Sequence, residues 1–240
     1  MSTPERDGVA LTHLDEPLFD GAGATKGDLV DYLDAVADLI VPGLADRPTY
    51  LILDIDPPAG GDFGHVVAAA RLIRQALADV GLAGAVKTSG AKGVHVYVPI
   101  EASADDAAAA TRAIAARAER LDPSLVTTAF IKDDRQGKVF LDSTRAHGAT
   151  VAAAYSPRAR PGVTVSFPVP WDDLDAIKPA DFTVHSVPAL VAGTTVPWAG
   201  QLPAPQPLSA DLVAEGHEIP IARVQAMHEG KRRARARRSS

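Results

Sequence analysis

The sequence predicts a mixed α/β fold in which helices pack against a central sheet. Short apolar runs bounded by Gly, Pro and Asp, typical of buried strands, alternate along the chain with longer segments of helical periodicity. The chain has 240 residues, of which 46% are hydrophobic. That length and composition suit one layered domain with a sizeable core.

The elements are expected in a regular order along the chain. Residues 1–24 are expected to be irregular, and Thr25 to cap a helix over residues 28–40 that ends at Pro42 and Gly43. Further helices are expected over residues 65–80, from Ser103 or Asp105 to about Arg120, and over residues 209–215. Strands are expected over residues 50–56, 85–88, 94–99 and 139–142, and loops with short strands over residues 149–168.

The C-terminal part differs in composition from the rest. We expect a catalytic domain over residues 1–200 and, over residues 201–240, a Pro-rich linker followed by a basic tail. Of the 24 Lys and Arg residues, six lie between Lys231 and Arg238, which leaves 18 against 30 acidic residues. An acidic body argues against a large nucleic-acid surface, because such surfaces are usually basic. The tail either binds phosphate backbones without sequence preference or serves only as a solubilising terminus.

The composition also limits the compartment. The chain has no cysteine, which excludes disulfides and thiolate metal sites. Its N-terminus lacks the apolar segment of a signal peptide, and no apolar stretch approaches the roughly 20 residues of a membrane span. We therefore expect a cytoplasmic protein with no membrane partner.

Two carboxylates close the first predicted strand. Side chains alternate between the two faces of a strand. Asp54 and Asp56 therefore share a face with Ile52, and the opposite face carries Leu51, Leu53 and Ile55. Like charges side by side on a buried strand repel each other unless a cation neutralises them. Oxygen ligands of this kind suit Mg²⁺ or Mn²⁺, so the pair indicates phosphate chemistry with a metal ion.

A second polar block, Lys-Thr-Ser-Gly-Ala-Lys-Gly-Val-His, covers residues 87–95. Its two glycines allow backbone N–H groups to approach an anion, and its lysines and serine add charge and donors for a phosphate chain. Taken alone, the block is also compatible with a plain β-hairpin, and a lone histidine such as His95 is more often structural than catalytic.

Two later blocks add a carboxylate and guanidinium groups. Asp142 ends the strand of residues 139–142 and is either an ordinary strand-end aspartate or the third ligand of a two-metal site. Arg158, in Tyr-Ser-Pro-Arg-Ala-Arg-Pro-Gly, can grip a phosphate with two hydrogen bonds or belong to an ordinary surface loop.

In this order the blocks, followed by Pro-Val-Pro-Trp-Asp-Asp-Leu, resemble the polymerase domain of bacterial ligase D, from about Thr25 to Phe182. That family belongs to the archaeo-eukaryotic primase superfamily and serves non-homologous end joining. The resemblance implies a layered primase-polymerase fold with a mixed, mainly antiparallel sheet flanked by helices. It points to a shortened, stand-alone form, because 240 residues leave no room for ligase or nuclease modules.

The resemblance also implies roles for individual residues. The triad Asp54, Asp56 and Asp142 would be catalytic and bind Mn²⁺ or Mg²⁺. Lys26 would contact the 5′-phosphate of a DNA end. The residues implied in binding the incoming nucleotide are Lys87, Ser89, Gly90, Lys92, His95 and Arg158.

This sequence departs from the family pattern in its DNA-contacting parts. The long segment that usually separates the first helix from the Asp-x-Asp strand is absent, since Arg47 and Pro48 almost directly precede that strand. Glu16 stands where a lysine is usual, and the asparagine common after the third aspartate is missing. The metal and triphosphate parts therefore look complete, and the DNA-gripping parts reduced.

Three hypotheses about function follow. The first is a metal-dependent nucleotidyltransferase that extends primers from NTP or dNTP on DNA ends or gaps, binding DNA weakly with help from the tail. It would work with a separate DNA ligase and an end-binding protein. The second is a non-catalytic nucleotide- or DNA-end-binding accessory protein. The third, from the residues alone, is a metal-dependent phosphohydrolase.

Overall fold

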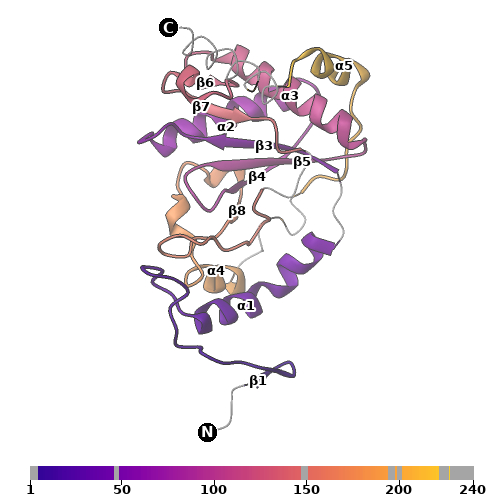
Figure 1. The fold of residues 1–240 in the computed structure, drawn as a ribbon. Helices are drawn as coiled ribbons and strands as arrows, with labels where there is room; N and C mark the ends of the chain where they lie inside the picture. The colour runs from indigo at the N-terminus through magenta and orange to yellow at the C-terminus, as the bar shows by residue number, and fades with distance from the viewer. Residues whose placement is uncertain are drawn as a thin grey trace.

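The computed structural model describes residues 5–45, 49–146, 151–193, 198, 202–221 and 227. Its centre is a six-stranded sheet with the strand order β6-β7-β3-β5-β4-β8 (Figure 1). All neighbouring strands are antiparallel except β6 and β7, which confirms the mixed, mainly antiparallel sheet. The strands are β3 (Thr49–Asp56), β4 (Ala85–Thr88), β5 (Val94–Ile100), β6 (Val126–Thr127), β7 (Val139–Asp142) and β8 (Pro168–Val169).

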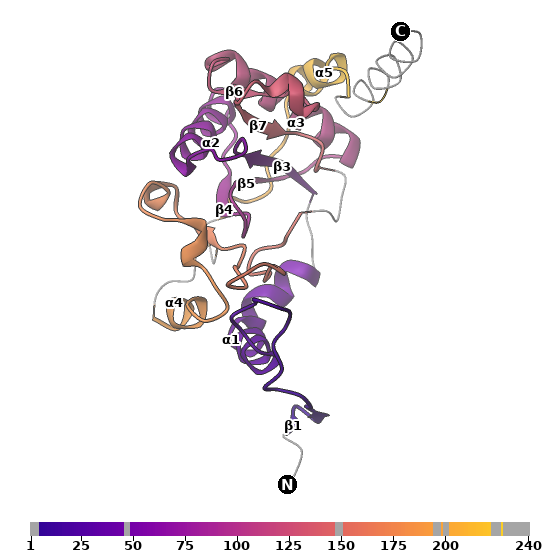
Figure 2. The same cartoon turned by 60° about the vertical axis from the view of Figure 1, so that its left-hand side comes forward.

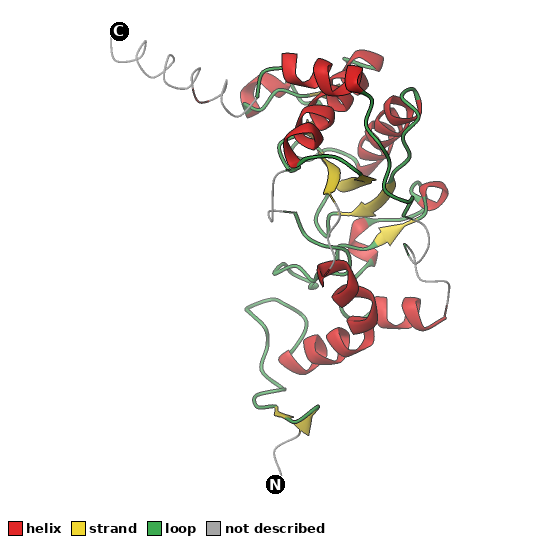
Figure 3. Ribbon diagram, turned by 90° about the vertical axis from the view of Figure 1, so that its right-hand side faces the viewer, coloured by secondary structure: helices red, strands yellow, loops and turns green. Residues whose placement is uncertain are grey.

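Among the described residues, five α-helices lie on the two sides of this sheet, with helical ribbons above and below the strands (Figure 3). They are α1 (Lys26–Ala45), α2 (Phe63–Ala78), α3 (Ala104–Leu121), α4 (Val187–Gly193) and α5 (Ala210–Glu218). Short 3₁₀ turns cover Lys132–Arg135, Trp171–Asp173 and Pro179–Asp181. Within the described ranges, no helix has both the length and the apolar character needed to cross a membrane.

The alternation of β3 and β5 decides which face of the sheet is apolar. Leu51, Leu53 and Ile55 of β3 join the valines of β5 in one core with α2 and α3. The alanine-rich face of α3 allows close packing on this layer, because small side chains bring a helix near its neighbours. The polar residues of both strands consequently lie on the opposite face, as the sequence predicts.

A second core lies apart from the first. It joins α1, α4 and residues 155–187, and in Figure 2 α1 and α4 lie together on the far side of the sheet from α2 and α3. Tyr32 of α1 donates a hydrogen bond to the carbonyl of Tyr155, and the rings of Phe167 and Phe182 stack with centroids 4.5 Å apart. This unit supports the loop that carries Arg158.

Two N-terminal features differ from the prediction. A small hairpin of β1 (Glu5–Arg6) and β2 (Val9–Ala10) occupies part of the segment expected to be irregular. Its turn residues Asp7 and Gly8 both have positive φ, and Asp-Gly is a strong signal for such a turn. Helix α1 continues through Pro42 to Ala45, since a proline removes one helical hydrogen bond without always ending the helix.

Residues 202–221 pack against the body. Gln206 bonds with its backbone to Pro99 and Glu101 beside the end of β5, and α5 lies on α3. Arg117 of α3 holds Glu215 through a forked ion pair. These residues are therefore part of the packed body, and the basic tail lies outside the described residues.

The contact between α5 and α3 depends on Gly216. A Cβ built on Gly216 would lie 1.9 Å from the carbonyl oxygen of Ala109, so that only glycine fits. We expect Gly216→Ala to lower the free energy of unfolding by about 1–3 kcal/mol and to expose α5 to proteolysis. The matched control is Gly43→Ala in α1, where a Cβ meets nothing within 4 Å and helix propensity favours alanine. Equal chemical denaturation curves for Gly216→Ala and wild type would contradict this packing.

Candidate active site

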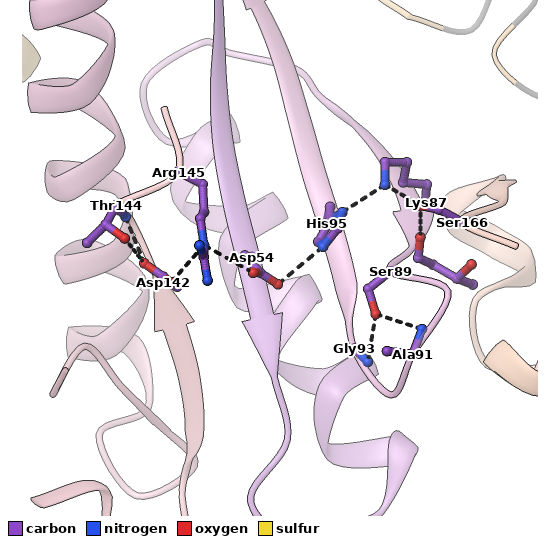
Figure 4. Close-up of polar contacts among 11 residues, drawn as sticks. Asp54, Lys87, Ser89, Ala91, Gly93, His95, Asp142, Thr144, Arg145 and Ser166 are labelled. Carbon is purple, nitrogen blue, oxygen red and sulfur yellow. Dashed lines mark hydrogen bonds and ion pairs between the residues drawn. The ribbon is translucent and has the colours of Figure 1, made fainter. Parts of the chain in front are cut away.

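A row of polar side chains crosses four neighbouring strands on the face opposite α2 and α3. Asp142 of β7 pairs with Asp54 of β3, Asp54 with His95 of β5, and His95 with Lys87 of β4. Residues directly opposite each other in antiparallel strands point to the same face, so register alone brings the four side chains together. Figure 4 shows them in this order, and all four are buried.

The row is linked by direct contacts. Nε2 of His95 lies 3.3 Å from Oδ1 of Asp54, and Nζ of Lys87 lies 2.7 Å from Nδ1 of His95. Lys87 also donates a hydrogen bond to Oγ of Ser166, in the segment just before β8. Asp54, for which the sequence predicts a metal-binding role, is thus anchored from the β5 side by a buried chain of donors.

These contacts change the protonation of the row. Burial raises the pKa of Asp54, but the hydrogen bond from His95 and the nearby cations outweigh burial and hold that pKa below its usual value. Burial and the adjacent Lys87 lower the pKa of His95 to about 4, so the ring is neutral at pH 7. Burial lowers the pKa of Lys87 well below its usual value.

Arg145 lies between the two paired carboxylates (Figure 4). Its Nε is 3.0 Å from Oδ2 of Asp142 and 3.5 Å from Oδ2 of Asp54. The other oxygen of Asp142 accepts hydrogen bonds from the backbone N and the hydroxyl of Thr144, at 2.8 and 2.6 Å. The guanidinium therefore bridges two strands and neutralises part of their negative charge.

Asp56 flanks this pair on the same strand. Burial, followed by the negative charges of Asp54 and Asp142, raises the pKa of Asp56 to about 6. The three carboxylates consequently repel one another, as oxygen ligands do before a cation joins them. The positive charges of Arg145 and Arg135 offset only part of this rise.

The donor set fits a divalent metal in chemistry and charge, because hard carboxylate oxygens suit Mg²⁺ and Mn²⁺. It is not a preformed cage: among the described residues, no three acidic, His or Cys side chains converge closely enough to hold an ion as they stand. In the described residues, Arg145 is the cation that forms ion pairs with both Asp54 and Asp142. A metal ion shared by these two carboxylates would have to displace that guanidinium.

The turn between β4 and β5 is organised by Ser89. Its Oγ accepts hydrogen bonds from the backbone N–H groups of Ala91 and Gly93, both at 3.2 Å. Gly93 passes so close to β3 that a Cβ would lie 2.1 Å from the carbonyl oxygen of Ile55. The serine therefore shapes the turn, and the glycine lets the turn lie directly beside the Asp54–Asp56 strand.

Arg158 packs over the same turn. Gly90 has φ +68°, and a Cβ on this residue would lie 2.7 Å from Cγ of Arg158. The hydroxyl of Thr164 donates a hydrogen bond to the carbonyl oxygen of Gly90 at 2.6 Å. The positive charge of Arg158 contributes to lowering the pKa of both Lys87 and His95, which places the guanidinium near the row. Gly90 and Arg158 are thus brought together as neighbours.

The remaining predicted residues are placed differently. Lys92 is exposed at the tip of the turn. Lys26 is the first residue of α1, in the second packing unit, and its amine donates to the carbonyl of Thr12 at 2.7 Å. Lys87, predicted to bind the nucleotide, is fully buried with its amine bonded inside the protein.

Three polar residues of this site have no role in the sequence prediction. Arg145 follows Asp142 by three positions, and that short spacing from a candidate ligand is the signal for it. Ser166 stands alone in an apolar run and gives no signal. Arg135 places its guanidinium 3.6 Å from the centroid of Phe140 on β7, within the electrostatic influence of Asp56.

Known proteins match this chain over the same region. A family model described as "LigD, primase-polymerase domain" matches residues 45–198. The chain is 39% identical over 137 residues, 56% of its length, to the multifunctional non-homologous end joining DNA repair protein LigD of Mycobacterium tuberculosis. It is 35% identical over 172 residues, 69% of its length, to LigD of Pseudomonas aeruginosa. The matched regions span 18% and 20% of those two longer proteins.

The fold matches a solved structure of the same kind. The polymerase domain of Mycobacterium tuberculosis ligase D, solved in complex with DNA, superposes with a TM-score of 0.70 at 26% identity. The match covers 77% of this chain and 94% of that domain. The family model, the relatives and the shared fold agree, and the chain belongs to the LigD primase-polymerase domain family.

Proposed function

We propose that this protein is a metal-dependent nucleotidyltransferase that adds nucleotides to a DNA 3′-hydroxyl in end-joining repair. The observation that carries the proposal is the direct pairing of Asp54 with Asp142 across β3 and β7, with Asp56 beside them. Family membership supports the reaction class. The bound metal, Mn²⁺ or Mg²⁺, would lower the pKa of the 3′-hydroxyl and balance the charge of the leaving pyrophosphate.

The side chains divide this work between the two halves of the site. Asp54, Asp56 and Asp142 would hold the metal, and His95 would keep one oxygen of Asp54 in a fixed direction by donating to it. The turn of residues 89–93 and Arg158 would bind the triphosphate of an NTP or dNTP. The turn lies beside β3 at Gly93, and Arg158 acts electrostatically on Lys87 and His95, so the nucleotide phosphates could reach both parts.

The proposed triphosphate site gives a prediction for Arg158 and Lys92. Each should contribute a charge-assisted contact of about 1.5–3 kcal/mol, so that Arg158→Ala or Lys92→Ala weakens nucleotide binding by roughly tenfold to a hundredfold. Arg158→Lys should restore only part of the affinity, because lysine lacks the planar fork. Fluorescent-nucleotide titration measures the effect, with Arg71→Ala as control, since Arg71 pairs with Asp175 on the surface. Unchanged affinity in Lys92→Ala would rule that lysine out of the site.

DNA is the proposed second substrate. The similar domain from Mycobacterium tuberculosis was solved with DNA. In this chain the acidic composition supports weak binding to DNA ends or gaps, with Lys26 on a 5′-phosphate and the tail from Lys231 to Arg238 adding non-specific attraction. A separate DNA ligase and an end-binding protein are the partners proposed for completing the joint.

Primer extension tests the proposed function. The full chain, Mn²⁺ and each set of nucleotides are combined with blunt, gapped and overhanging DNA. Lengthened primers support a nucleotidyltransferase. Nucleotide binding without extension identifies the non-catalytic accessory protein, and release of inorganic phosphate or nucleoside monophosphate without extension identifies the phosphohydrolase; either result would overturn the proposal.

A further inference from the structure

Lys87 is a fully buried lysine. Its amine makes two hydrogen bonds, and neither of them goes to a carboxylate. The partners are Nδ1 of His95 at 2.7 Å and Oγ of Ser166, and the amine lies 5.4 Å from the ring centroid of Tyr97. Burying an amine away from water is costly unless its hydrogen bonds replace those it loses. A residue that only reached for a phosphate would not need this placement.

These hydrogen bonds form a row that runs from the carbonyl of Thr88 to the carboxylate of Asp54, and the two acceptors at its ends set the direction of every bond between them. At one end Ser166 donates to the carbonyl oxygen of Thr88 at 2.7 Å, and a carbonyl can only accept. The lone pairs of the serine oxygen are then available to accept from Lys87. This fixes Lys87 as the donor to Ser166.

At the other end the acceptor is the carboxylate of Asp54. Nε2 of His95 lies 3.3 Å from that carboxylate and must carry a proton to donate to it, and Nδ1, 2.7 Å from the amine of Lys87, then accepts from Lys87. Lys87 therefore supplies both N–H donors at the middle of a chain whose two ends are acceptors. An amine has at least two N–H groups whether charged or neutral, so the arrangement holds in either form.

We propose that Lys87 is a positioning residue for Asp54: it fixes the tautomer of His95, and His95 in turn fixes the direction of the carboxylate. The inference rests on the proposed function for Asp54 as a metal ligand. Groups that orient a ligand from behind typically change metal affinity by about tenfold to a hundredfold when they are removed. Lys87 acts on the metal through two intervening groups and touches no nucleotide.

The test compares Lys87→Met, which keeps the length of the side chain and removes both donors, with wild type in the full chain. Nitrogen-detected NMR of the metal-free protein reports which ring nitrogen of His95 carries the proton. Calorimetry with Mn²⁺ alone reports metal affinity without nucleotide or catalysis. Ser166→Ala is a milder second variant, and Thr111→Val is the control, because Thr111 makes a buried hydrogen bond of 2.7 Å to Ala107 within α3.

In wild type we expect a protonated Nε2 and a bare Nδ1. In Lys87→Met we expect both tautomers and Mn²⁺ affinity reduced by about tenfold to a hundredfold, with a smaller loss in Ser166→Ala and none in Thr111→Val. An unchanged tautomer, or unchanged Mn²⁺ affinity, in Lys87→Met would overturn the proposal. If Lys87→Met does not fold, Lys87→Leu, which also removes both donors, decides by the same two measurements.

The proposed function and this inference can fail separately. A wild-type protein that binds Mn²⁺ in a Lys87-dependent way but extends no primer would refute the nucleotidyltransferase and leave the positioning role standing. If the wild-type protein extends primers and the Lys87→Met variant binds Mn²⁺ with normal affinity, the nucleotidyltransferase stands and the positioning role is refuted. A wild-type protein that binds no Mn²⁺ would overturn both.

Discussion

Replacing Asp142 by asparagine is expected to reduce Mn²⁺-dependent nucleotide addition by about a thousandfold or more while the protein stays folded. Asp142 pairs directly with Asp54, so the substitution would remove a charged oxygen ligand from the centre of the proposed metal site. Losing a ligand of this kind removes several kcal/mol of charge stabilisation from phosphoryl transfer. Asp54→Asn should have the same effect, because the two carboxylates would share the metal.

The measurement is single-turnover primer extension, with circular dichroism and thermal melts to confirm folding. Glu215→Gln is a suitable control, because its carboxylate binds Arg117 and Arg120 on the α3–α5 surface, away from the row. Extension by Asp142→Asn at the wild-type rate would remove this residue from the site and with it the observation on which the proposed function depends.

Replacing the third carboxylate, Asp56, should make the metal-free protein more stable. The pKa of Asp56 is raised to about 6, so its ionised form destabilises the metal-free fold at neutral pH. At pH 7.5 in EDTA, Asp56→Asn should therefore unfold at higher denaturant than wild type, by about 1–2 kcal/mol after allowing for partial exposure. The difference should shrink as the pH falls through 6 and vanish near pH 4, where wild-type Asp56 is protonated in the folded state.

Local pattern was sufficient to predict the four longer strands of the sheet, β3, β4, β5 and β7, but not the two-residue strands β6 and β8 at its edges. Alternation in β3 and β5 places Asp54 and His95 opposite the core, and the dipeptide Asp7-Gly8 is a local signal for the β1–β2 hairpin. The helix that runs through Pro42 could not be predicted in the same way, because local propensity alone does not decide where a helix ends in a packed protein.

The contacts of the site depend on pairing between distant strands. Lys87 and Ser166 are 79 positions apart, so nothing local in the sequence indicates that the amine is buried and bonded there. Arg145 has a local signal in its spacing from Asp142, but its approach to Asp54 follows from the register of β3 with β7. Residue types carry the prediction of metal and phosphate chemistry, while the register of the sheet determines which residue contacts which.

Arg145 gives the second large expected effect, with opposite signs in metal-free and metal-bound protein. Its guanidinium is the cation seen between Asp54 and Asp142, at 3.5 and 3.0 Å. Arg145→Met should leave two buried carboxylates without that charge and lower metal-free stability by about 2–3 kcal/mol, less than for a fully buried pair because Arg145 is partly exposed. Arg145→Lys should retain much of the stability, since the charge remains.

In the same variant Mn²⁺ should bind more tightly, by at least about tenfold, because the ion no longer competes with a tethered cation for the same oxygens. A ligand that binds only the folded state raises its stability, so Mn²⁺ should raise the melting temperature of Arg145→Met more than that of wild type. Thermal melts with and without Mn²⁺, together with calorimetric titration, measure both signs in one protein, and Arg74→Met, which removes an exposed arginine 3.8 Å from Asp172, controls for loss of a surface charge. Weaker Mn²⁺ binding in Arg145→Met would show that the guanidinium assists the metal site instead of competing with the ion for it.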